Sequence, residues 1–106
     1  MYFDFEAGNK AYKLRLNTRN LVELEKRIGC NPLNIFGNGE ELPTVSVMVA
    51  ILHASLQQYQ HGISLNDAYD IFDAYLEEKT MTDFVWVILE IYKASGLIES
   101  DAAEKN

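Results

Sequence analysis

The chain has 106 residues, which is enough for one domain and not for two. Hydrophobic residues make up 48% of the chain and charged residues 24%, a composition that excludes disorder of the chain as a whole. The formal net charge is −7, and acidic groups dilute the basic ones near the N-terminus. A nucleic-acid partner is therefore not predicted, because phosphate binding needs a cluster of uncompensated cations.

Two alternating runs at the N-terminus predict a β-hairpin. Residues 2–6 and 11–16 alternate between apolar and polar side chains, and the turn-rich residues 7–10 separate them. A lone hairpin is marginal in water, so we expect its apolar face to lie on the helices that follow. That face carries Phe3, Phe5, Tyr12, Leu14 and Leu16.

The remainder predicts a small bundle of about four helices. The first spans residues 18–28, with Asn17 or Thr18 as its N-cap and Gly29 as its stop. A short helical turn follows at Pro32, and residues 37–41 predict a loop.

The second helix is predicted over residues 44–60. Its core stripe is Val45, Met48, Val49, Leu52, Leu56 and Tyr59. A further apolar stripe of Val47, Ile51 and Ala54 lies on the opposite side. Such a helix is either central to its domain or docks a partner through the second stripe, so these three residues are candidate protein-binding positions.

The third helix is predicted over residues 65–78, after a capping box from Ser64 to Asp67. Its inward side chains are Leu65, Ala68, Tyr69, Phe72, Tyr75 and Leu76. Its other face carries Asp70, Asp73 and Glu77, which suits a solvated face better than a basic partner or a metal ion.

The fourth helix is predicted over residues 82–95, capped by Thr80 or Thr82 and closed by Gly96. Phe84, Val85, Ile88, Ile91 and Tyr92 face inward, and Leu97 with Ile98 packs back on the helix end. Trp86 falls on the opposite, polar side. It is a candidate interface anchor unless the hairpin or the C-terminal tail covers it, since tryptophan is enriched in binding hot spots.

Candidates for catalysis or metal binding are few. Cys30 is the only cysteine, which fits a reducing compartment, and we expect it to be a small apolar filler. His53 and His61 stand in no known nucleophile motif, and the chain has no P-loop, GxGxxG or HExxH. We expect no enzyme activity and no cofactor or metal site.

A membrane partner is not expected either. No apolar run approaches the ~20 residues that span a bilayer. The N-terminal residues are acidic where a signal peptide would be basic, so we expect a cytoplasmic protein. The domain is predicted over residues 1–98, with a flexible acidic tail over 99–106.

A series of short motifs follows one another in a characteristic order. These motifs are Tyr12-Lys13-Leu14-Arg15-Leu16-Asn17-Thr18, Leu24-Glu25, Gly29, Asn31-Pro32-Leu33, His61-Gly62-Ile63-Ser64, Tyr69-Asp70-Ile71, Tyr75-Leu76 and Ser95-Gly96. Their order resembles that in the tail assembly chaperones of long-tailed phages and prophages, especially those of Gram-positive hosts, and the resemblance covers roughly residues 10–97.

The resemblance implies a small helical chaperone that coats the tape measure protein, keeps it soluble and helps to recruit tail tube subunits. It also implies self-association, absence from the finished virion, and in many members a longer frameshifted form. Two other functions stay open at this point: a structural tail or head–tail connector component, and an acidic inhibitor or regulator that binds a basic protein.

Overall fold

The computed structural model describes residues 1–36 and 42–100, where a two-stranded hairpin precedes four α-helices and a 3₁₀ turn. The predicted mainly α fold with an N-terminal hairpin is confirmed. The predicted loop at residues 37–41 and residues 101–106 of the predicted tail lie outside the described residues. The elements are β1 (Phe3–Ala7), β2 (Lys10–Leu14), α1 (Thr18–Ile28), η1 (Pro32–Asn34), α2 (Val45–Leu56), α3 (Leu65–Leu76) and α4 (Met81–Ala94).

The hairpin closes through a two-residue turn. Gly8 and Asn9 both have positive φ, of 58° and 68°, which the twist of a tight hairpin requires. A Cβ atom at Gly8 would lie 3.0 Å from the Cβ of Ala74, so glycine also lets the turn approach α3 closely. The strands pair antiparallel, with Phe3 opposite Leu14 and Phe5 opposite Tyr12, which puts the predicted apolar face on the helices.

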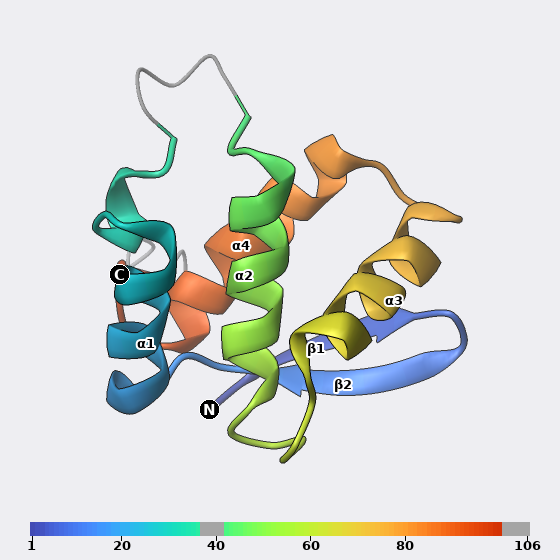
Figure 1. Ribbon diagram of the computed structural model, residues 1–106, viewed down its shortest axis with the longest axis horizontal. Coiled ribbons are helices and arrows are strands. Elements are labelled where there is room, and N and C mark those ends of the chain that lie inside the picture. Colours follow the sequence, from blue (N-terminus) through green and yellow to red (C-terminus); the bar gives the residue numbers. More distant parts are fainter. Residues whose placement is uncertain (37–41, 101–106) are drawn as a thin grey trace.

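Helix α2 stands at the centre of the molecule, between α1 and α3 and in front of α4 (Figure 1). It is apolar on all sides, so it must be enclosed by other elements. Eight of its twelve residues are buried, from Met48 to Leu56 with the exception of His53. Even Ser55 is fully buried, and its hydroxyl donates to the carbonyl of Leu52 at 3.0 Å.

An aromatic cluster fixes β1 to α3 and α4. The Phe5 ring stacks on Tyr75 with centroids 5.2 Å apart and meets Phe84 edge-on at 6.2 Å. Phe72 completes the cluster against Phe84 at 5.0 Å. Edge-to-face and offset geometries suit the aromatic quadrupole and add to the hydrophobic gain of burial. The hairpin is thereby held as part of the core.

The helix ends follow the predicted chemistry closely. Asn17 caps α1, and Gly29 ends it at a φ of 76°. Capping boxes open α3 at Ser64 and Asp67 and α4 at Thr80 and Asp83. After α4, the N–H of Leu97 donates to the carbonyl of Tyr92 at 2.9 Å, so Leu97 and Ile98 pack back on the core as predicted.

Helix α2 ends at Leu56, four residues before the predicted end. At this point two glutamine side chains donate hydrogen bonds to backbone carbonyls. The amide of Gln57 donates to the carbonyls of His53 and Ile63, and that of Gln60 donates to the carbonyls of Leu56 and Lys13. These bonds stabilise a bend in place of another helical turn.

Four predicted core positions are wrong. Val45 lies in the first turn of α2 and is exposed, and Tyr59 lies beyond the end of α2 and is exposed. Tyr69 is exposed because the inward stripe of α3 runs through Ile71 instead. Val85 is only half-buried, and Val87 takes its place in the core. The errors at Tyr69 and Val85 each displace the predicted inward stripe of the helix by about half a helical turn.

The buried hydroxyl of Tyr92 provides a test of the packing around η1. This hydroxyl donates to the carbonyl of Pro32 at 2.7 Å, across 60 residues of chain. Burial raises the pKa of Tyr92, so the phenol stays neutral and able to donate. We expect Tyr92→Phe to lower the free energy of unfolding by about 1–2 kcal/mol, because the carbonyl loses its partner. Urea denaturation measures the change, and Tyr69→Phe on the surface is the control.

The two capping boxes predict a defined loss of stability in acid. Hydrogen bonds from Ser64 and from Thr80 lower the pKa of Asp67 and of Asp83 below the ordinary value of 3.8. A lowered pKa means that the contribution is complete above pH 3.8 and is lost as the pH falls through the folded-state pKa values.

We therefore expect the double variant Asp67→Asn, Asp83→Asn to be less stable than the natural chain near neutral pH and equally stable in strong acid. Urea denaturation across the acid range measures this difference. Asp73→Asn, at an exposed residue outside both boxes, is the control. A gap between the two proteins that is independent of pH would contradict the prediction.

Candidate functional site

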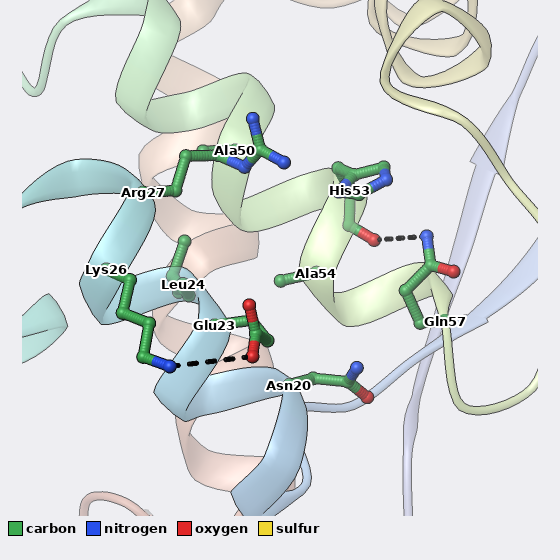
Figure 2. A pocket seen from close by; sticks show the side chains of 9 residues that line it. All are labelled: Asn20, Glu23, Leu24, Lys26, Arg27, Ala50, His53, Ala54 and Gln57. Atoms are coloured by element: carbon green, nitrogen blue, oxygen red, sulfur yellow. Dashed lines mark hydrogen bonds and ion pairs between the residues drawn. The ribbon is translucent and has the colours of Figure 1, made fainter.

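A groove between α1 and α2 is one hollow of the surface, with a volume of about 460 Å³. Figure 2 shows its walls, with the side chains of α1 facing those of α2. Ala50 and Ala54 are small enough to leave the space open, and the Lys26 ammonium pairs with Glu23 across 3.9 Å at the rim. The lining residues are Asn20, Glu23, Leu24, Lys26, Arg27, Ala50, His53, Ala54 and Gln57.

A hydrogen bond to a backbone carbonyl fixes the side chain of His53 in this groove. Its Nε2 lies 3.1 Å from the carbonyl oxygen of Ile63, and a carbonyl only accepts, so Nε2 carries the hydrogen. Burial lowers the pKa of His53 and the Arg27 guanidinium lowers it further, against the opposing effect of the Ile63 bond. The neutral ring has no hydroxyl or thiol nucleophile beside it in the lining, so the groove carries no nucleophile–base pair.

Metal ligation gains no support from the described residues, which contain no group of three or more His, Cys, Asp or Glu side chains able to hold an ion. Cys30 is exposed, which corrects its interpretation as an apolar filler. The acidic face of α3 is exposed, as expected for a solvated face, with Asp70, Asp73 and Glu77 all at the surface.

Three of the four candidate binding residues turn inward. Ile51 is fully buried and Ala54 is 7% exposed, while Val47 is half-buried against the core. Since α1 and α3 pack on opposite sides of α2, the second apolar stripe is covered by the chain itself. Packing within the domain accounts for most of this stripe, and the hypothesis that it docks a partner stays a prediction.

Trp86 is the exception, and 65% of it is exposed. Neither the hairpin nor residues 95–100 cover it. It lies one helical turn before Glu90 and two before Lys93, whose side chains pair at 3.5 Å. An exposed indole of this size is what an interface anchor requires.

The indole forms one wall of a second hollow, the β1–α4 groove, of about 440 Å³. The opposite wall is β1, and the end of α3 closes the floor with Tyr75. Burial raises the pKa of Tyr75 to about 12, with a smaller contribution from the Asp83 carboxylate. The lining residues are Phe3, Asp4, Phe5, Glu6, Tyr75, Lys79, Asp83, Trp86 and Val87.

The β1–α4 groove combines apolar rings with an excess of carboxylates. Its lining contains the carboxylates of Asp4, Glu6 and Asp83 and one cation, Lys79. Of the two grooves, only this one contains a large exposed aromatic side chain. Sequence reasoning found Trp86 and considered the hairpin as a possible cover for it, but it did not predict a groove between Trp86 and β1, because no sequence spacing links residue 4 to residue 86.

Comparison of the chain with protein-family models, with curated proteins and with solved structures finds no match. Among the described residues, no helix is long and apolar enough to cross a membrane.

The exposure of the indole can be measured directly, because Trp86 is the only tryptophan. We expect its fluorescence emission at the long wavelength of hydrated indole and ready quenching by acrylamide, which is neutral and therefore not repelled by the surrounding carboxylates. Binding of a partner in the β1–α4 groove would shift the emission to shorter wavelength and reduce quenching. Blue-shifted emission that resists quenching in the isolated chain would contradict the placement of Trp86.

Proposed function

We propose that this chain is a tail assembly chaperone of a long-tailed phage or prophage. It binds the tape measure protein, keeps it soluble and helps to recruit tail tube subunits around it. The observation that carries the proposal is the 65% exposed Trp86 in the wall of the β1–α4 groove. The resemblance of residues 10–97 to this family supplies the class of partner.

The physical demands of this function agree with the surface. A chaperone of a long, aggregation-prone protein needs an apolar anchor for its partner, and the Trp86 indole beside Val87 and Phe3 provides one. The net charge of −7 keeps a partner coated with many copies in solution. The chain then acts in the host cytoplasm by binding alone, with self-association along the partner and no part in the finished virion.

Co-expression of this chain with the tape measure protein that is proposed as its partner tests the proposal. We expect the tape measure protein to become soluble and to co-purify with many copies of the chain. Trp86→Ala should reduce the captured amount about tenfold or more, because a central tryptophan contributes 2 kcal/mol or more to an interface. Tyr69→Ala, an exposed aromatic residue on α3, is the matched control and should leave capture unchanged.

A tape measure protein that stays insoluble and captures nothing would overturn the proposal. Mass spectrometry of purified virions then separates the other functions. The chain in mature particles would identify a structural component. One-to-one binding to a basic protein, lost on Asp70→Lys with Asp73→Lys, would identify an acidic inhibitor that uses α3.

A further inference from the structure

We propose that the outer edge of β1 docks an extended, basic segment of the partner protein, which adds to the hairpin as a third strand. This inference deepens the proposed function, on which it rests in one respect: the chain binds a protein beside Trp86. It adds the chemistry and the conformation of the segment that binds there.

The register of the hairpin decides which backbone groups of β1 point outward. A two-residue turn makes the flanking Ala7 and Lys10 a hydrogen-bonded pair, and hydrogen-bonded and non-hydrogen-bonded pairs then alternate along the strands. Asp4 and Glu6 therefore stand in non-hydrogen-bonded pairs. Their N–H and C=O groups point away from β2, toward the outer edge.

Hydrogen bonds at the other edge of the sheet agree with this alternation, and they close that edge at Lys13 and Arg15. Lys13 is opposite Asp4, and its N–H donates to Oε1 of Gln60 at 2.7 Å. The Gln60 amide donates back to the carbonyl of Lys13 at 2.9 Å, and the N–H of Arg15 donates to the carbonyl of Ser55 at 2.9 Å. The end of α2 thus occupies the β2 edge as a neighbouring strand would.

No such group closes the β1 edge within the described residues, where the outward N–H and C=O of Asp4 and Glu6 have no hydrogen-bond partner. An unpaired strand edge is a template for another strand, and proteins normally cover it. Within the same described residues, on β2 only the outward groups of Ala11 are left without a partner, whereas on β1 those of both Asp4 and Glu6 are, so β1 offers the longer open edge to a partner.

The space for a third strand is the β1–α4 groove. Four consecutive residues of β1, from Phe3 to Glu6, line it, although their side chains alternate between the two faces of the sheet. A hollow lined in this way runs along the strand edge. A further hollow of about 340 Å³ lies between Met1 and the Glu90–Lys93 turn of α4, and Phe3 lines both hollows.

The charged side chains along the β1–α4 groove favour a basic segment as the one that binds there. Asp4, Glu6 and Asp83 outnumber Lys79 along the groove, so a segment with lysine or arginine at alternate positions is complementary. Pairing of β1 with the β1 of a second copy would bring the carboxylates of Asp4 and Glu6 together, and like charges opposite one another destabilise a sheet. Trp86 adds an apolar and cation–π contact for the same segment.

A synthetic probe tests the inference without an identified partner. The probe is a capped peptide of about seven residues in which lysine and valine alternate. We expect binding, followed by Trp86 fluorescence, with slowed amide hydrogen exchange at Asp4 and Glu6. The matched peptide N-methylated at the residues that would pair with β1, and the peptide with glutamate for lysine, should each bind about tenfold more weakly or worse.

Proline at an outward position tests the edge itself. Glu6→Pro removes an N–H that takes no part in the hairpin ladder, and it should weaken peptide binding about tenfold. Ala11→Pro, at the residue opposite Glu6 on β2, removes an outward N–H from the other edge and is the matched control. Glu6→Lys keeps the backbone and changes the charge alone, so it tests the site if the proline variant fails to fold.

Equal binding of the N-methylated peptide, or exchange protection elsewhere than β1, would overturn strand addition. These outcomes can be distinguished from the failure of the proposed function. A chain that solubilises the tape measure protein but ignores the peptide leaves the chaperone function standing and overturns this inference. A chain that binds the peptide at β1 but leaves the tape measure protein insoluble supports the site and overturns the function.

Discussion

The enclosure of α2 is the constraint on which the rest of the fold depends. A helix that is apolar on every side gains free energy only when other elements cover all its faces. The chain meets this demand with α1 and α3 on opposite sides, α4 behind and the hairpin across the end (Figure 1). Each covering element buries only a stripe of its own, and α1 buries little more than Leu24. The polar and charged outer faces follow from this arrangement.

The same enclosure leaves the hairpin with two unlike edges. Helix α2 ends at Leu56, and the polar residues after it turn back over β2, so that Gln60 bonds the backbone of Lys13. On the other side, the aromatic cluster of Phe5, Phe72, Tyr75 and Phe84 holds the face of β1 rather than its edge. The face is therefore buried while the edge borders a groove, and Trp86 stands across that groove.

In so small a domain, the apolar side chains available for binding are those that are not buried in the core. Ile51 and Ala54 are buried because α2 is central, and Val47 is half-buried against the same core, so packing accounts for most of their hydrophobicity. Trp86 has no such explanation: α4 already buries Phe84, Val87, Ile88, Ile91 and Tyr92 on its other side. A large aromatic ring exposed to water beside an open strand edge has an unfavourable free energy of hydration and adds nothing to the core. Such exposure suits a protein-binding residue.

Local chemistry alone determined the element types, the caps at Asn17, Ser64 and Thr80, the stop at Gly29 and the Gly-Asn turn, because these features depend on contacts within about four residues. The polar setting of Trp86 was also evident from helical periodicity. The burial of Ile51 and the early end of α2 were decided by tertiary structure, as were the closed β2 edge and the meeting of β1 with Trp86. Each of these rests on contacts between residues far apart in the chain, such as Lys13 with Gln60, which no local pattern encodes.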